Sequence, residues 1–308
     1  MTGIPFVAPL AVEYGRVDQV SPLIRRVVAE NPSKYTYLGT GTYIVGRGTV
    51  AVIDPGPRLD SHFDALVAAL DGERVGAILV THCHADHSPL AARLREHSGA
   101  PTYGFGPASP VVEAIEGETL EESVDLEFVP DVALRDGEIV SGPGWTFTAV
   151  HTPGHTSNHL CFALAEERAL FPGDHVMGWS TTVVAPPDGD MAAYLRSLDR
   201  LIDRRDDVLW PTHGGPITDA GPFLDAYRAH RLDREAQVFD AVAGGLVDIP
   251  AIVAVLYADV REELHKAAGR SVLAHLVKLV ADGRLVVEGD GSAGPEARFG
   301  VLRSPRSS

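Results

Sequence analysis

A window of six residues, HCHADH, carries four side chains that bind metal ions or transfer protons. His82, His84, Asp86 and His87 follow the apolar run VGAILV almost at once. Imidazole and carboxylate suit zinc and similar divalent ions. In an extended stretch, His82 and His84 point the same way because side chains alternate along a strand, and Cys83 points the opposite way. Asp86 and His87 come where the chain turns, so this one loop can supply ligands to two adjacent metals.

Three more residues of ligand type follow strand-like segments later in the chain. His155 lies in HTPGHT, Asp174 in FPGD and His213 in PTHGG. Each has glycine or proline close by, which allows a sharp turn. A single histidine at a strand end is more often a packed or surface residue than a ligand. The recurrence of the same placement favours ligands and predicts a site built from several strand ends.

The elements that must position these residues alternate between strands and helices. YTYLGTGTYIV and VAVID predict a hairpin around GRGT, and Ser61–Leu70 predicts a short amphipathic helix. Ser88 is the expected N-cap of the helix PLAARLREH, with Pro89 at its first position. Strands are predicted over WTFTAVHT, HLCFAL, RALFPGD and VLWPTH, the last of which ends at His213. Helices are predicted over MAAYLRSLDRLID and Pro222–Ala243. This alternation predicts sheets covered by helices.

The pattern changes after Gly244–Gly245. DIPAIVAVLY and ELHKAAGRSVLAHLVKLVADG are expected to be helical, and RLVVEG is expected to start a terminal hairpin. The sequence therefore predicts a catalytic domain over residues 1–244 and a small winged-helix-like domain over residues 245–308. The second domain holds eight basic and eight acidic side chains, without the basic face that nucleic-acid modules usually show. Packing against the catalytic domain, or a contact in a homodimer, is its expected role.

Composition and charge exclude several classes of protein. No segment of the 308 residues approaches the roughly 18 apolar residues of a membrane span. The first residues lack the basic and apolar segments of a secretory signal, and two cysteines make a disulfide framework improbable, so a cytoplasmic protein is expected. Residues 1–244 carry the whole net charge of −16, and Phe105–Pro143 holds ten acidic residues against Arg135 alone. Such a field repels polyphosphates.

The site residues carry a resemblance to a known family. HCHADH, followed by His155, Asp174 and His213 in that order, resembles the metallo-β-lactamase superfamily. VIDPG, LRDGEIV, HTPGHT, LFPGD and THGGP extend the likeness from about Tyr35 to Arg234. The segment GDHVMGWSTTVVAPPDGD and the winged-helix-like end resemble the branch of β-lactamase-like protein 2. That branch includes a mitochondrial endoribonuclease, and fungal thioesterases of polyketide pathways resemble it too.

The resemblance implies a fold and a metal site. The fold is α/β, an αββα sandwich with a small C-terminal winged-helix-like domain, and the site lies at one edge of the two sheets. Two divalent metal ions are implied, with zinc expected and iron or manganese as alternatives. The implied ligands of one metal are His82, His84 and His155, and those of the other are Asp86, His87 and His213, with Asp174 bridging. All seven positions match, so an inactive relative is not expected.

The chemistry follows from two neighbouring cations. They would stabilise a bridging hydroxide near neutral pH, which is a nucleophile that needs no serine or cysteine. One metal would polarise the scissile carbonyl or phosphoryl oxygen, and both would stabilise the charge that builds up on it. By the resemblance, Asp86 is placed to orient the hydroxide and accept its proton, so it is the expected catalytic residue.

Other polar residues near the motifs have two interpretations each. Asp54, after VAVI, is either a hydrogen-bond partner of a ligand imidazole or a turn residue before Pro-Gly. His151 and His159, on either side of His155, are expected to pack or to support ligands, and His175 is left unassigned. Either the lining of a substrate cleft or ordinary loop packing is expected of four residues after Asp174: Trp179, Ser180, Thr181 and Thr182.

Three functions compete. The favoured one is a metal-dependent hydrolase of an ester, thioester or lactone of modest size. The second is an endoribonuclease that cleaves single-stranded RNA with the same metals, which the acidic charge disfavours. The third is a non-enzymatic regulator with a winged-helix module, which the complete ligand set disfavours. Hydrolysis of β-lactams is not expected, because nothing indicates export and one fold serves many chemistries.

Overall fold

The first of two large sheets carries the HCHADH motif. The computed structural model describes residues 3–109, 124–289 and 291–302. Within them, seven strands lie side by side in chain order: β1 (Val17–Gln19), β2 (Ile24–Val28), β3 (Gly41–Arg47), β4 (Thr49–Ile53), β5 (Arg74–Leu79), β6 (Thr102–Gly104) and β7 (Val132–Ala133). β1 to β4 pair antiparallel, and β4 to β7 pair parallel. Parallel pairs need crossovers, and α1 (Asp60–Ala69) and α2 (Leu90–Ser98) supply two of them.

The second sheet carries the later predicted ligands. Its strands, as far as the chain is described, lie in the order β12 (Val208–Leu209), β11 (Ala169–Phe171), β10 (Leu160–Leu164), β9 (Trp145–His151) and β8 (Ile139–Gly142). Only the pair β11–β12 is parallel, and α3 (Met191–Arg204) crosses between these two strands. The long helix α4 (Ala220–Ala243) follows β12.

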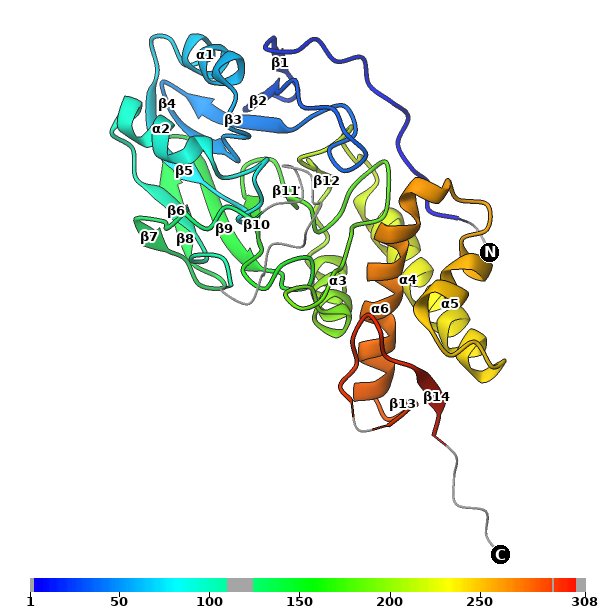
Figure 1. Cartoon of the computed structure of the whole chain (residues 1–308). Coiled ribbons are helices and arrows are strands. Elements are labelled where there is room, and N and C mark those ends of the chain that lie inside the picture. Colours follow the sequence, from blue (N-terminus) through cyan, green and yellow to red (C-terminus); the bar gives the residue numbers. More distant parts are fainter. Residues whose placement is uncertain (1–2, 110–123, 290, 303–308) are drawn as a thin grey trace, which may run out of the picture.

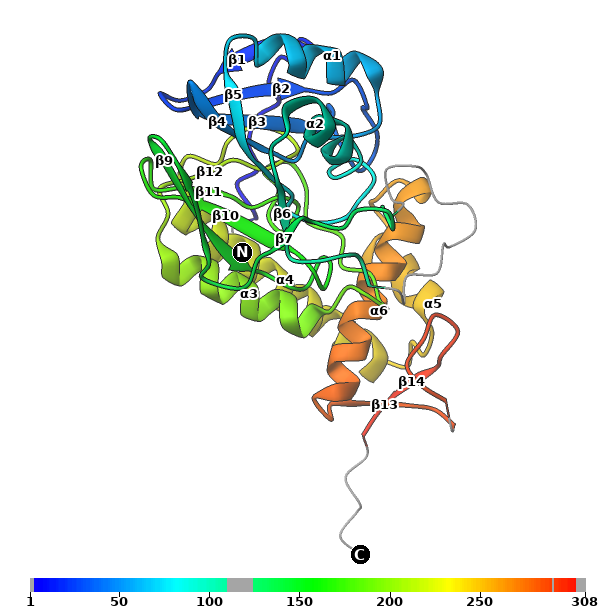
Figure 2. The same cartoon turned by 90° about the vertical axis from the view of Figure 1, so that its left-hand side faces the viewer.

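Apolar side chains form three layers around these sheets. Along β5, Leu79 faces the layer between the sheets, where it joins Phe147, whereas Ile78 faces the layer under α2 with Leu94. This alternation is the two-residue period of a strand. Leu198 of α3 belongs to the layer on the outer face of the second sheet. Figures 1 and 2 show α1 and α2 outside the first sheet and α3 and α4 outside the second, so the predicted αββα sandwich is confirmed.

Two local predictions need correction. Ser88 does not cap α2, because Pro89 occupies the cap position and the Ser88 hydroxyl donates to Asp125 Oδ2 at 2.6 Å instead. The strand predicted over VLWPTH is shorter, since β12 covers only Val208–Leu209. Pro211 has no amide hydrogen to extend the ladder. His213 therefore lies in the loop after the strand rather than at its last position.

The C-terminal elements pack against α4. They are α5 (Ile249–Leu256), a 3₁₀ helix η2 (Glu262–Leu264), α6 (His265–Ala281) and a hairpin of β13 (Leu285–Val287) and β14 (Phe299–Val301), which together confirm the predicted winged-helix-like unit. Leu276 and Phe299 share an apolar cluster with Val238 of α4. Figure 1 shows α6 lying across α4 beside α3. Of the described helices, none has the length and apolar character needed to cross a membrane.

Trp145 of β9 connects the two sheets by packing and by a hydrogen bond. Its indole is buried between them, and Nε1 donates to the Thr49 carbonyl of β4 at 2.9 Å. Two glycines make room for the ring, because a Cβ at Gly46 or at Gly142 would overlap it. Only a residue without a side chain fits at these two places.

We expect Gly142→Ala to lower the free energy of unfolding by about 1–3 kcal/mol, because the added methyl group overlaps an indole that is buried and hydrogen-bonded to Thr49. Denaturant unfolding measures this change. Gly221→Ala is the matched control, since no neighbour lies within 4 Å of its added Cβ. Equal stabilities of the two variants would contradict this view of the Trp145 contact.

Candidate metal centre

The seven predicted ligand side chains lie together at one edge of the two sheets. The motif residues follow β5, and the other three follow β9, β11 and β12 of the second sheet. Their nitrogen and oxygen atoms form three overlapping groups, each with atoms within 4.8 Å of one another: His82, His84 and His155; His82, His87 and Asp174; and Asp86, His87 and His213. Because the groups share members, they form one continuous cluster.

The first group, which we call the three-histidine group, consists of His82, His84 and His155. His84 Nδ1 lies 2.9 Å from His82 Nε2 and 3.1 Å from His155 Nε2. Burial lowers the pKa of all three rings, to about 3 for His84. The rings are therefore neutral near pH 7. Neutral imidazoles with converging nitrogens are suited to hold a cation.

The second group, which we call the mixed group, consists of Asp86, His87 and His213. Asp86 Oδ2 lies 3.1 Å from His213 Nε2 and 3.3 Å from His87 Nε2. Although burial opposes the charged form, Asp86 and Asp174 raise the pKa of His87 well above its usual value and that of His213 to about 10. The same two histidines hold the pKa of both carboxyl groups below the usual range despite burial. This group thus carries protons that an entering cation would displace.

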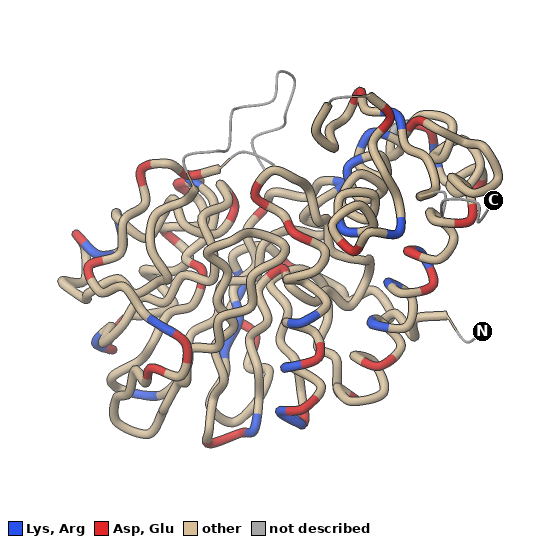
Figure 3. Tube along the Cα trace, turned by 90° about the horizontal axis from the view of Figure 1, so that it is seen from below, with Lys and Arg blue, Asp and Glu red and all other residues tan. Residues whose placement is uncertain are grey.

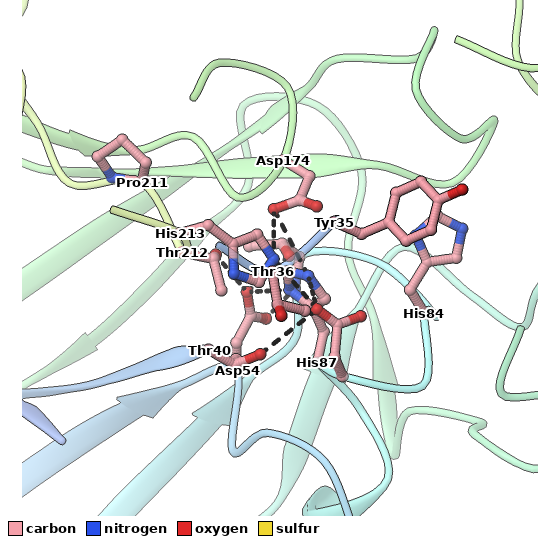
Figure 4. Close-up of polar contacts among 12 residues, drawn as sticks. Tyr35, Thr36, Thr40, Asp54, His84, His87, Asp174, Pro211, Thr212 and His213 are labelled. Carbon is pink, nitrogen blue, oxygen red and sulfur yellow. Dashed lines mark hydrogen bonds and ion pairs between the residues drawn. The ribbon is translucent and has the colours of Figure 1, made fainter. Parts of the chain in front are cut away.

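Asp174 lies between the two groups. Its Oδ1 is 3.5 Å from His87 Nε2 and 3.3 Å from His213 Nε2 of the mixed group, and Figure 4 shows it facing both rings. A carboxylate oxygen of Asp174 also lies within 4.8 Å of a ring nitrogen of His82 in the three-histidine group. Within the described part of the chain, Asp174 Oδ1 and His87 Nε2 are buried and form no hydrogen bond beyond these ion-pair contacts. Buried polar atoms of this kind carry a free-energy cost that a bound cation would remove. These nitrogen and oxygen donors therefore fit divalent ions such as zinc, iron or manganese.

The second nitrogen of each of four rings has a fixed partner. His82 Nδ1 lies 3.0 Å from Thr81 Oγ1, and His87 Nδ1 lies 2.9 Å from Asp54 Oδ2. The partners of the other two Nδ1 atoms are carbonyls, Val183 for His155 at 2.7 Å and Gly39 for His213 at 3.2 Å. Such contacts orient an imidazole and fix which nitrogen carries the proton. The Nε2 atoms of these rings are left to face the cluster.

Asp54 combines the two interpretations that its sequence context left open. Its backbone has a positive φ of 48°, as the turn interpretation requires. Its carboxylate is fully buried and accepts hydrogen bonds from Thr81 N, Thr81 Oγ1 and Thr212 Oγ1, besides the contact with His87. Asp54 is therefore both a turn residue and a support for His87.

The remaining histidines near the motif pack outside the cluster. The His151 ring stacks on Phe105 with centroids 4.2 Å apart. His159 is buried, with Nδ1 2.9 Å from Thr152 Oγ1. The unassigned His175 is buried against the ring of Tyr194, and burial lowers its pKa to about 3.

Cys83 points away from the cluster, as alternation predicted. It packs in the layer under α2, and its sulfur accepts a hydrogen bond from Asn158 Nδ2 at 3.1 Å. Of the residues after Asp174, Trp179 is half-buried and stacks on Tyr37 with centroids 4.7 Å apart. Thr182 is buried, and its hydroxyl donates to the Asp174 carbonyl at 2.7 Å. Of the two interpretations given above for Thr182, loop packing therefore holds and cleft lining does not.

Sequence reasoning missed the loop between β2 and β3. Thr40 Oγ1 lies 3.4 Å from Asp86 Oδ2, and its backbone amide is held by Asn31 Oδ1 at 2.9 Å. The Gly39 carbonyl contacts His213. No spacing rule marks these residues, because threonine, asparagine and a backbone carbonyl are common in any loop. Only the proximity of segments far apart in the chain reveals them.

The acidic segment 105–143 is partly outside the described residues, which omit 110–123. The described residues on either side of this omission contact the HCHADH loop or its neighbours. Val124 forms a bridge with His84, and the Asp125 amide donates to the Cys83 carbonyl at 2.7 Å. At the other end, Asn158 Nδ2 donates to the Gly106 carbonyl at 3.4 Å. The residues on either side of the omitted stretch therefore lie close to the HCHADH loop.

Two family descriptions match the chain. The sequence pattern described as "Metallo-beta-lactamase superfamily" matches residues 37–213, and that described as "Beta-lactamase associated winged helix domain" matches residues 249–294. An atrochrysone carboxyl ACP thioesterase of Aspergillus chevalieri is 32% identical over 287 residues, which cover 89% of this chain and 86% of that protein. A lactamase-like protein of Aspergillus niger is 30% identical over 296 residues, which cover 90% and 86%.

Two solved structures have the same fold over nearly the whole chain. A beta-lactamase domain protein from Burkholderia ambifaria has a TM-score of 0.77 and 23% identity, and it covers 97% of both chains. A metallo-beta-lactamase family protein from Thermus thermophilus has a TM-score of 0.74 and 24% identity, and it covers 92% of this chain and all of that one. Both likenesses extend beyond the two sheets into the C-terminal elements.

We expect the metal-free protein to take up about two zinc ions per chain and to release protons as it does so. At pH 7 the raised pKa values mean that His87 and His213 are protonated, whereas the three-histidine group is neutral. Proton release should therefore fall as the pH rises towards 10. Calorimetric titration in buffers of different ionisation enthalpy measures it.

His213→Ala and His84→Ala form a matched pair for this titration. Each removes one ring of the cluster, but only His213 carries a proton near pH 7. His213→Ala should reduce the proton release more than His84→Ala. Zinc uptake without proton release in the unmodified protein would show that the charges of the mixed group are wrongly assigned.

Proposed function

Because the chain belongs to the metallo-β-lactamase superfamily and is a hydrolase, we propose that it cleaves thioesters of modest size at a centre of two divalent metal ions. The observation that carries this proposal is the overlap of the two ligand groups through His82, His87 and Asp174. Overlapping groups allow two cations to act on one scissile bond. The thioesterase named among the relatives covers most of this chain, and it favours a thioester over an oxygen ester or a lactone.

The proposed ligands divide between the two groups. One ion would be held by the three-histidine group and the other by the mixed group, with Asp174 contacting both. Zinc is the expected metal, since its usual ligands are imidazole nitrogens and carboxylate oxygens, and iron or manganese would accept the same donors. This division is supported by the distances within each group and by the position of Asp174 between them.

The chemistry divides between the ions and the side chains. Two bound cations would lower the pKa of a water molecule between them and polarise the thioester carbonyl. Asp86 is proposed to orient that water and accept its proton. The pKa of Asp86 lies below the usual range, so its carboxylate is ionised near neutral pH and can accept a hydrogen bond from that water. Thr40 Oγ1 lies close enough to hold one of its oxygens in place.

We further propose a domain division and a compartment. Residues 1–244 would form the catalytic domain and residues 245–308 the winged-helix domain, with the boundary just after α4 ends at Ala243. The C-terminal unit would pack on the catalytic domain or meet a second copy of the chain. Cys83 and Cys161 are free and buried, and this is compatible with a reducing cytoplasm.

RNA cleavage is the second candidate, and the charge pattern disfavours it. Figure 3 shows acidic and basic positions interspersed over the C-terminal elements, where a nucleic-acid module would present a basic face. Asp125 of the acidic segment contacts the HCHADH loop, since its amide donates to the Cys83 carbonyl. Repulsion from such residues acts within about 8 Å at physiological salt. A small thioester would avoid most of that field, whereas an RNA strand would have to lie across it.

A hydrolysis panel on zinc-loaded protein tests the substrate class. We expect turnover of at least one small acyl thioester and weaker cleavage of single-stranded RNA. Lactones and aryl esters are tested in the same panel. Efficient cutting of RNA that is lost in His82→Ala, with every acyl substrate untouched, would replace the thioesterase by an endoribonuclease.

Two substitutions compare a proposed metal ligand with a residue that faces away from the cluster. Asp174→Ala should lower kcat/KM by at least about 100-fold, since the proposed bridging position supports both metals. Cys83→Ala should have a much smaller effect, because its buried thiol faces away from the cluster and burial raises its pKa to about 12. The metal content of both variants is measured beside the rate. Comparable losses of activity with metal retained in both would refute the assignment.

A further inference from the structure

Three polar residues on α4 form a buried stripe behind the metal centre. Tyr227, Arg231 and Glu235 are spaced four residues apart, which places them on one face of the helix. Their exposed fractions are 0%, 3% and 5%. Burying an arginine is costly, and an apolar residue of similar volume often serves stability as well. This placement therefore calls for a role other than packing, and we call these residues the α4 stripe.

The first two residues of the α4 stripe hold one residue of the loop after Asp174. The Thr182 amide donates to Tyr227 Oη at 2.6 Å, and Arg231 Nη2 donates to the Thr182 carbonyl. The Thr182 hydroxyl donates to the Asp174 carbonyl at 2.7 Å. Both backbone polar groups of Thr182 thus end on α4, while its side chain is tied to the backbone of the proposed bridging residue.

The next residue in this loop supports a proposed ligand. The Val183 carbonyl accepts a hydrogen bond from His155 Nδ1 at 2.7 Å. Because the peptide bond between Thr182 and Val183 is planar, fixing the Thr182 carbonyl also fixes the direction of the Val183 amide. The contact from Arg231 therefore limits where the Val183 Cα lies, and the carbonyl that holds His155 is attached to this atom.

Aromatic rings and the C-terminal domain hold the stripe itself in place. The Arg231 guanidinium lies 5.1 Å from the centroid of the Tyr194 ring and 5.7 Å from that of Tyr227. One turn further along α4, Glu235 lies 3.0 Å from Lys278 of α6 and 3.3 Å from Arg284. Figure 1 shows α6 crossing α4. The helix that holds Thr182 is thus also held by the C-terminal elements, one turn further along the same face.

We propose that Arg231 is a positioning residue for the metal centre, which acts through Thr182 and Val183 to orient His155. The inference rests on the proposed function only in taking His155 as a metal ligand. A planar guanidinium that stacks on two rings presents its donor in one direction, which a flexible lysine cannot do equally well. Loss of Arg231 releases the Thr182 carbonyl, and the His155 ring then gains freedom to turn.

Metal affinity tests this role without any substrate. We expect Arg231→Met to weaken the zinc affinity of the three-histidine group about 10-fold, at the low end of the range for residues that support ligands, in competition with a chromophoric chelator. The visible absorption spectrum of the cobalt-loaded protein should change as well, because it reports the geometry around the ion. Arg231→Lys keeps a donor and should fall between Arg231→Met and the unmodified protein.

Two controls separate positioning from stability. Arg228→Met removes an arginine of the same helix that pairs with Asp199 at the surface, and it should leave affinity and spectrum unchanged. Glu235→Gln weakens the contact with α6 without touching Thr182, so it should lower the melting temperature with little change in affinity or spectrum. If Arg231→Met does not fold, Tyr227→Phe releases the Thr182 amide and should weaken zinc binding in the same direction.

The outcomes are distinguishable. Unmodified protein that binds no zinc would overturn the proposed metal centre itself. Normal zinc binding together with an unchanged affinity and cobalt spectrum in Arg231→Met would overturn only the role of Arg231. The same would follow if Arg231→Met and Glu235→Gln lowered melting temperature and affinity in equal proportion, since Arg231 would then act through stability alone.

Discussion

The buried carboxylate of Asp54 joins strand ends of both sheets. It follows β4, and it accepts hydrogen bonds from Thr81 after β5 and from Thr212 after β12. Its fourth contact is Nδ1 of His87. A buried carboxylate is tolerated only when its oxygens are satisfied, so these segments have to meet at one point. That meeting point holds the loop of HCHADH and the loop of His213 within reach of each other.

The cluster residues that follow strands of the second sheet are supported in a different way. There the supports come from one loop. The Val183 carbonyl accepts a hydrogen bond from His155, and the Thr182 hydroxyl donates one to the Asp174 carbonyl. Both belong to a loop that lies on α4, and α4 in turn packs on the C-terminal domain. The sheets and helices thus fix ligand side chains that come from separate loops. Catalysis by bound metal ions requires that these ligands be held in defined positions.

Much of the fold and of the candidate site could be predicted from the sequence. The seven clustered residues are of the types that bind metals, and each follows an apolar segment that was recognised as a strand. Thr40, Val183 and Arg231 could not be found in this way, because they support the cluster from other segments of the chain and belong to common residue types. Ser88 was assigned to the wrong partner for a related reason. Local rules favoured a helix cap, but the hydroxyl bonds Asp125, which is 37 residues away in the chain.

Anomalous diffraction from crystals of the zinc-loaded protein would test the proposed dinuclear centre most directly. We expect two peaks about 3.5–4 Å apart. One should lie among His82 Nε2, His84 Nδ1 and His155 Nε2, and the other among Asp86 Oδ2, His87 Nε2 and His213 Nε2, with the Asp174 carboxylate contacting both. A single peak, or zinc bound only outside this cluster, would contradict the proposed centre.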